Sequence, residues 1–196
     1  MLDLYDPANW DTPLFPVSVV AQAALISPAT LRQWIVRYAD DLKLWEPKAA
    51  GVDALMAGAK AEGDGLAHRL SLRGALHIAA AARLISKGAT VKDAYMATAH
   101  WVHIGDMSQP GHWVGEPEPT DTRLPAGLFP DPAWTFLIHY SGDNARVVSV
   151  ARDGEALPFK FSDLFAQGHP VYTPPTIVFL NMLDRYVRGV CEGYLR

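Results

Sequence analysis

The chain has 196 residues and carries 17 Lys and Arg against 21 Asp and Glu, a formal net charge of −4. Hydrophobic residues make up 49% of it, which argues against a disordered chain and predicts a globular protein with a buried core. The single cysteine, Cys191, excludes an intramolecular disulfide framework and a thiolate-rich metal site. The apolar runs fall short of the roughly 18 residues of a membrane span, and the acidic N-terminus lacks the basic region of a secretory signal. We therefore expect a cytoplasmic protein without membrane contact.

Two short helices joined by a tight break are predicted near the N-terminus. Residues 17–24, "VSVVAQAA", are apolar and compatible with a helix. The chain then breaks at Leu25, a residue that resists a positive φ, and at Ile26. Ser27 and Pro28 suit the cap and the first turn of a second helix. The apolar residues of this helix recur at helical spacing: Leu31, Trp34, Ile35 and Tyr38. Such an arrangement is typical of a helix-turn-helix.

Two longer helices are predicted further along the chain. Ser71 can cap a helix over residues 72–87, and Gly88 supplies its C-terminal stop. The stretch "TVKDA", from residue 90, resembles a capping box and starts a second helix that runs to about residue 104.

The pattern changes after residue 104. Residues 105–133 contain six prolines and four glycines, which indicates a linker or an extended surface arm. The stretches "TFLIHYS" and "ARVVSVA", separated by "GDN", predict a β-hairpin over residues 135–151. A final helix is expected from about Pro175 to Tyr194. Its apolar stripe consists of Ile177, Leu180, Leu183, Val187 and Val190.

The positive charge is concentrated in two blocks. Residues 17–43 carry a net charge of +1 and residues 66–95 a net charge of +4. Binding of nucleic acid depends on local positive charge that faces phosphate rather than on the total charge. The acidic total therefore does not exclude a DNA-binding protein.

Two stretches in these blocks, "FPVSVVAQAALISPATLRQWIVR" and "HRLSLRGALHIAAAARLISKGATVKDA", resemble the MerR-type winged helix-turn-helix and related excisionase-like DNA-binding domains. The resemblance covers about residues 15–98, half of the chain. "SPATLRQWI" is its most specific part, and "RLSLRGAL" is similar to the family's wing strand and the helix after it. The resemblance implies that the second helix enters the major groove of DNA and that a wing contacts the flanking phosphates.

The resemblance also implies a set of DNA-binding residues. By position, four residues of the second helix face DNA, and two arginines lie at the wing and at the start of the next helix. Arg can pair with guanine and Gln with adenine in the major groove, Thr can donate to phosphate, and the capped helix N-terminus offers backbone N–H groups to a phosphate. The expected residues are Ser27, Thr30, Arg32, Gln33, Arg37, Arg69 and Arg73.

The stretch "HWVHIGDMSQPGHW" offers a different kind of site. His100, His103 and His112, with Asp106, could ligate zinc and leave one position open for water. An HxxH pair without the H-E-x-x-H arrangement is a weak signal, however, and histidines at a helix end are more often explained by the helix dipole. We therefore predict no metal, no cofactor and no enzymatic activity.

Together these patterns predict a mainly α fold with a small β component. The expected parts are an N-terminal arm (1–14), a MerR-like winged helix-turn-helix domain (15–104), a Pro/Gly-rich linker (105–133) and a C-terminal α+β module (134–196). The expected function is that of a sequence-specific transcriptional regulator, a homodimer on double-stranded DNA. The C-terminal module would serve oligomerisation, or bind a protein partner or a small effector. The alternative is a protein-interaction module, antitoxin-like or an adaptor, whose main partner is another protein.

Overall fold

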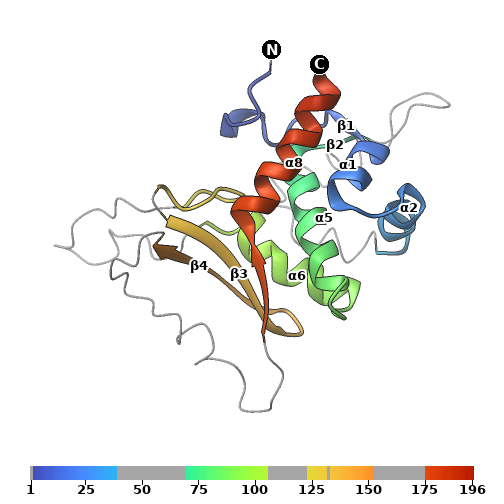
Figure 1. The fold of residues 1–196 in the computed structure, drawn as a ribbon. Helices are drawn as coiled ribbons and strands as arrows, with labels where there is room; N and C mark the ends of the chain where they lie inside the picture. Colours follow the sequence, from blue (N-terminus) through green and yellow to red (C-terminus); the bar gives the residue numbers. More distant parts are fainter. Residues whose placement is uncertain (1, 39–68, 106–122, 132, 152–174) are drawn as a thin grey trace.

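The computed structural model describes residues 2–38, 69–105, 123–131, 133–151 and 175–196 (Figure 1). Within these ranges the fold is mixed α and β. In chain order the elements are η1 (Pro7–Asn9), β1 (Phe15–Pro16), α1 (Val17–Ala24), α2 (Pro28–Arg37), β2 (Arg69–Leu70), α5 (Leu72–Ile85), α6 (Val91–Val102), β3 (Ala133–Ser141), β4 (Asn144–Ala151), β5 (Thr176–Phe179) and α8 (Leu180–Leu195). None of the helices in these ranges is long and apolar enough to cross a lipid bilayer.

Helix α5 lies at the centre of the helical part, packed against α1, α6 and α8 (Figure 1). Eleven of its fourteen residues are buried, because neighbours enclose it on several sides. Five of these are alanines, whose small side chains let the surrounding helices approach closely. Ser71 caps the helix by accepting a hydrogen bond from Gly74 N–H at 3.1 Å, as predicted.

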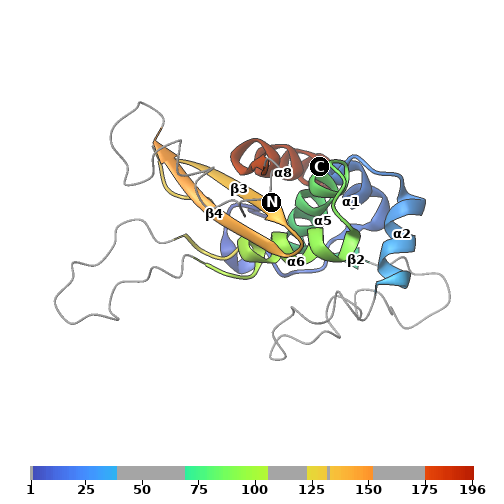
Figure 2. The same cartoon turned by 90° about the horizontal axis from the view of Figure 1, so that it is seen from below.

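The larger sheet is antiparallel, with strand order β4-β3-β5. The predicted hairpin is confirmed: β3 pairs with β4, with Leu137 opposite Val147, through a turn at Gly142, whose φ is 55°. Figures 1 and 2 place this sheet and α2 at opposite ends of the molecule. A second, two-stranded sheet pairs β1 with β2, so the start of α1 lies beside the start of α5.

The final helix begins later than the sequence predicted. Residues 176–179, expected to be helical, form β5 and pair with the inner strand β3, with Val178 opposite Leu137. Thr, Ile, Val and Phe in succession favour a half-buried strand, and pairing with β3 decides between the two conformations. The helix prediction was therefore wrong for these residues and right from Leu180 onward.

Part of the predicted linker is packed against the end of α6. Arg123 is buried and donates hydrogen bonds to the carbonyl oxygens of His100, Trp101 and Ile104. Trp101 in turn donates from Nε1 to the carbonyl of Gly127 at 2.8 Å. The guanidinium thus satisfies the carbonyl groups that a helix leaves unpaired at its C-terminus. In its described part, this segment is structural rather than a solvated arm.

The N-terminal segment is also fixed, and it lies on α8. Leu4 and Trp10 are buried, and Trp10 Nε1 donates to the carbonyl of Leu4 at 2.9 Å. Arg188 of α8 donates to the same carbonyl and to Asp184, its buried partner one turn earlier. Buried residues of α1, α5, α6, β3 and α8 belong to one continuous cluster, so the two predicted modules share a core within the described ranges.

Candidate nucleic-acid interface

A three-residue turn joins α1 to α2. Leu25 has φ 58° and ψ 40°, the left-handed conformation that a leucine resists. Its N–H donates to the carbonyl of Gln22, and the N–H of Ile26 donates to that of Ala21, both at 3.0 Å. This pair of hydrogen bonds is a Schellman motif, which here forms without the usual glycine. The two short helices joined by a tight turn that the sequence predicted are thus present as α1 and α2.

Ser27 then starts α2. Its Oγ accepts a hydrogen bond from Thr30 N–H at 3.0 Å and lies 2.8 Å from Thr30 Oγ1. One of these two hydroxyls donates its proton to the other, so the accepting hydroxyl still has a proton to donate. Ser27 is exposed, and this remaining hydroxyl proton together with the N–H of Ala29 is available to an anion, because Pro28 has no N–H and that of Thr30 is bound to Ser27.

Helix α2 is held by few buried side chains. Leu31, at 1% exposure, is its only buried residue, whereas α1 buries five of its eight residues. Trp34 and Ile35 are half-buried against the core beside Leu31. Of the other residues of α2, Thr30 is half-buried, and the exposed ones are Pro28, Ala29, Arg32, Gln33, Val36 and Arg37.

The exposed residues form an arc around α2. At 3.6 residues per turn, Arg32 and Arg37 lie about 140° apart, at the two edges of this arc. Gln33 lies inside the arc, with two residues that the sequence reading did not assign to the interface, Ala29 and Val36. Val36 is 79% exposed. A signal existed in the sequence, because Val36 lies off the apolar stripe at helical spacing.

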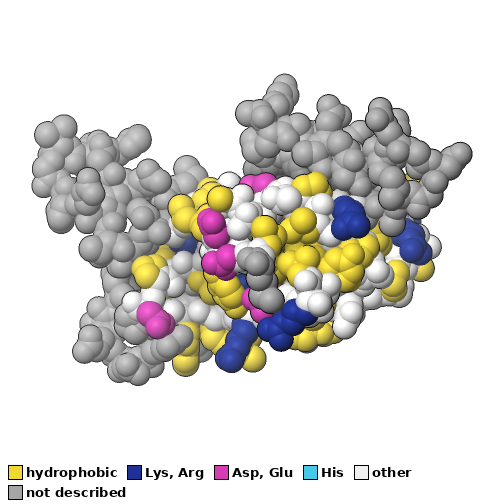
Figure 3. Space-filling view, turned by 90° about the horizontal axis from the view of Figure 1, so that it is seen from above, with side chains coloured by type: hydrophobic (Ala, Val, Ile, Leu, Met, Phe, Trp, Pro, Cys, Tyr) yellow, Lys and Arg dark blue, Asp and Glu magenta, His cyan; other side chains and the backbone are white. Residues whose placement is uncertain are grey.

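The electrostatics of this segment favour an anion. No Asp or Glu occurs in residues 15–38, which carry Arg32 and Arg37. Within the described residues neither arginine has an ion-pair partner; Arg37 only approaches the ring of Tyr38, at 5.9 Å. In Figure 3 the visible Asp and Glu side chains lie in the left half and the middle of the face. The visible charged side chains on the right, where α1 and α2 lie, are Lys or Arg.

The two arginines predicted at the wing and at the start of the next helix differ from each other in their surroundings. Arg69, on β2, is exposed and donates to the carbonyl of Leu14 at 2.8 Å. Arg73 is half-buried in a bidentate ion pair with Asp11 and donates to the carbonyl of Val102. Its guanidinium is therefore engaged inside the fold. The segment between α2 and β2, where a wing would lie, falls outside the described residues.

A buried histidine pair lies between α5 and α6. His77 Nε2 is 2.8 Å from the carbonyl oxygen of Tyr95, and its Nδ1 is 3.1 Å from Nε2 of His103. Since a carbonyl only accepts, His77 carries its proton on Nε2, and its Nδ1 accepts from His103. Burial and the neighbouring imidazole lower the pKa of His77 to about 3. Burial and the nearby Arg73 lower the pKa of His103 to about 4.

Within the described residues these two histidines form a neutral, hydrogen-bonded pair that packs against Tyr95. His77 stacks on the ring of Tyr95 with centroids 3.6 Å apart. Among the residues that the structure describes, no group of three His, Cys, Asp or Glu could hold a metal ion. His112 and Asp106, the other candidate ligands, lie outside those residues.

Comparison with known proteins adds no family to this description. No protein-family model, no curated protein sequence and no solved structure matches the chain. The functional argument therefore rests on the geometry of α1 and α2.

Proposed function

We propose that the protein binds double-stranded DNA through α2 and acts as a sequence-specific transcriptional regulator. The observation that carries the proposal is the form of α2 itself. It follows a three-residue turn after α1, is anchored through Leu31, and presents two arginines that have no ion-pair partner among the described residues, in residues 15–38, which contain no Asp or Glu. A helix inserted into the major groove needs this combination of a shallow anchor and an open, basic surface.

The arc on α2 suggests a division of roles. A helix in the major groove has a phosphate backbone on each side and base edges in front. Arg32 and Arg37, at the edges of the arc, are placed to meet the two backbones. Gln33 can pair with adenine, and Val36 can contact a thymine methyl group. Specificity would thus come from the middle of the arc and affinity from its edges.

The double variant Arg32→Gln/Arg37→Gln tests the edges. Fluorescence anisotropy would follow binding to a pool of random-sequence duplex DNA as the salt concentration is raised. We expect wild-type affinity to fall steeply with salt because phosphate contacts release counterions. The double variant should bind at least about tenfold more weakly. The slope of its log affinity against log salt concentration should correspond to about two fewer phosphate contacts. Circular dichroism should remain unchanged, since neither side chain has an ion-pair partner in the described fold.

Arg146→Gln is a control for the loss of positive charge elsewhere on the molecule. It removes one exposed positive charge from β4, at the opposite end of the molecule from α2 (Figure 2). We expect it to leave DNA affinity nearly unchanged, and each single α2 variant to weaken it. Equal binding by the double variant would refute the assignment of α2. Wild-type protein without salt-dependent DNA binding would overturn the function and favour the protein-interaction alternative.

Gln33→Ala and Val36→Ala test the middle of the arc. Sequences selected from a random duplex pool should differ between these variants and the wild type, with about 1–3 kcal/mol less discrimination at the contacted base pair for Gln33→Ala. The salt slope should not change, because neither side chain neutralises a phosphate.

A further inference from the structure

The outward face of α8 exposes large side chains to solvent within the described residues. Met182 and Tyr186 are 61% and 41% exposed, and Tyr194, 44% exposed, keeps an edge contact with Phe15 at 6.3 Å between ring centroids. Gly189 and Gly193 lie between these side chains, one turn apart. A Cβ built on either glycine meets no described atom within 4 Å, so neither is required by the packing of the monomer. Both nevertheless weaken the helix relative to alanine.

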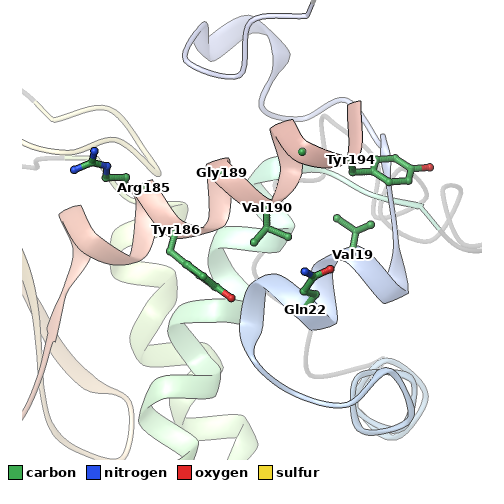
Figure 4. Close-up of a pocket in the computed structure, with 8 residues that line it drawn as sticks. Val19, Gln22, Arg185, Tyr186, Gly189, Val190 and Tyr194 are labelled. Atoms are coloured by element: carbon green, nitrogen blue, oxygen red, sulfur yellow. The ribbon is translucent and has the colours of Figure 1, made fainter. Parts of the chain in front are cut away.

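This face borders a groove between α8 and α1. The groove has a volume of about 630 Å³. Figure 4 shows Val19 and Gln22 of α1 facing Val190 of α8, with Tyr186 toward one end and Tyr194 toward the other. The two glycines form the floor on the α8 side, where the backbone itself is accessible.

The rotation of α8 about its own axis is fixed by its buried side. Asp184 and Arg188 form a buried ion pair, and the guanidinium lies 5.0 Å from the ring centroid of Tyr5 and 4.9 Å from that of Trp10. Turning the helix would expose this pair and break the contact with the N-terminal segment. The glycine face is therefore held outward.

The charges beside the glycines are self-complementary. Arg185 is exposed and Glu192 half-buried, and neither has an ion-pair partner among the described residues. Seven residues is nearly two helical turns, so both lie on the same side of the outward face. A two-fold axis near Gly189 would place Arg185 of each copy opposite Glu192 of the other copy, so that two ion pairs form across the interface. The helices would then run antiparallel, an arrangement that helix dipoles favour.

We propose that the outward face of α8 binds the same face of a second copy of this chain, with the two α8 helices antiparallel about a two-fold axis near Gly189. In this arrangement Tyr186 of each copy packs on the backbone between Gly189 and Gly193 of the other. The ring is an aromatic anchor in a groove, and the glycines allow its close approach. The proposal goes beyond DNA binding and does not depend on it, because the protein alone suffices for its test.

Gly189→Gln tests the close approach. Sedimentation velocity over a wide range of protein concentration would give the dimer dissociation constant of the full chain. We expect the wild type to dimerise and Gly189→Gln to dimerise at least about tenfold more weakly, because the added side chain overfills the contact. The melting temperature of the dilute, monomeric protein should rise, since a residue other than glycine favours the helix. Ala29→Gln adds similar bulk to an exposed position of α2 and should leave self-association unchanged.

A charge exchange tests the pairing. Arg185→Glu and Glu192→Arg should each weaken the dimer, and the double variant should restore it, because the two cross-pairs are re-formed with reversed signs. Lys87→Glu makes the same charge change beyond the end of α5 and should have no effect. A wild type that stays monomeric at all concentrations would overturn the proposal. So would a dimer that Gly189→Gln leaves intact, or one that the double charge exchange does not restore.

Discussion

Two helix pairs in this molecule are joined by the same backbone motif, but their second helices differ in how much of their surface they bury. Helix α5 ends as α1 does: Gly88 N–H donates to Ile85 and Ala89 N–H donates to Leu84. The left-handed position is Gly88 in one connection, with φ 102°, and Leu25 in the other, with φ 58°. A hydroxyl side chain then caps the second helix of each pair, Thr90 for α6 and Ser27 for α2.

The difference lies in what the second helix does with its surface. Helix α6 buries seven of its twelve residues and becomes part of the core, whereas α2 buries only Leu31. The same local hydrogen bonds therefore build either a packed hairpin or a projecting helix, depending on the side chains that follow the turn. Helix α2 contributes little to the core, which leaves its surface free for a partner.

The largest effects on stability are expected for Leu84→Ala in α5 and Leu31→Ala in α2. Both leucines are buried, and each truncation should cost about 2–5 kcal/mol locally. Native-state hydrogen exchange separates the two. Leu84→Ala should speed the exchange of the amides in α1, α5 and α6, whereas Leu31→Ala should act mainly on α2, because α2 has no other fully buried anchor. Uniform acceleration by Leu31→Ala would show that α2 is as integral to the core as α6.

The next effect separates the two helix pairs by pH. Among the described residues, the histidines whose pKa values are lowered belong to the α5–α6 pair. The pKa values of His77 and His103 are lowered from 6.5 to about 3 and about 4. Above pH 6.5 both histidines are neutral in the folded and in the unfolded state. Below pH 6.5 they bind protons in the unfolded chain but stay neutral in the folded one. Stability should thus be complete above about pH 6.5 and fall as the pH drops toward 4, by about 1.4 kcal/mol per pH unit for each histidine.

Thermal unfolding between pH 7 and pH 4.5 would measure this loss. His103→Gln keeps an N–H donor for His77 and removes one titrating group, so its melting temperature should depend less on pH. Burial raises the pKa of Asp184, an effect of opposite sign that both proteins share. An unchanged pH dependence in His103→Gln would contradict the neutral pair.

The smallest effects concern the turns themselves. Leu25→Gly should raise stability by about 0.5–1 kcal/mol, because glycine adopts the left-handed conformation without strain. Gly88→Leu should lower stability by about 1–2 kcal/mol through strain alone, since no described atom lies within 4 Å of the added Cβ. Urea denaturation measures both. A loss of stability in Leu25→Gly would show that the exposed leucine side chain contributes more than its backbone strain costs.

Local signals were readable from the sequence, and long-range ones were not. Ser27, Ser71 and Thr90 were expected as helix caps or starts, and the structure shows all three accepting the N–H three residues on. A cap depends only on its own turn of helix, so the residue types suffice. The hairpin of β3 and β4 was readable for the same reason.

Features that depend on distant partners were missed. Residues 176–179 become a strand because β3, far back in the chain, offers an edge to pair with. The sequence did not indicate that Arg73 pairs with Asp11 of the N-terminal segment, and its contact with DNA stays a prediction. For the interface, the sequence indicated the turn and the arginines of α2. The exposure of Val36 was readable in the same way, because this residue lies off the apolar stripe of the helix.

The hydrogen bond between Arg188 and Leu4 has a consequence for biosynthesis. Leu4 is synthesised 184 residues before Arg188. Helix α1 likewise packs on α8, so its hydrophobic face must wait for α8. Such contacts between distant parts of the chain slow folding. Newly made protein would therefore acquire a stably seated α1, and with it the α1–α2 pair, only once α8 has been synthesised.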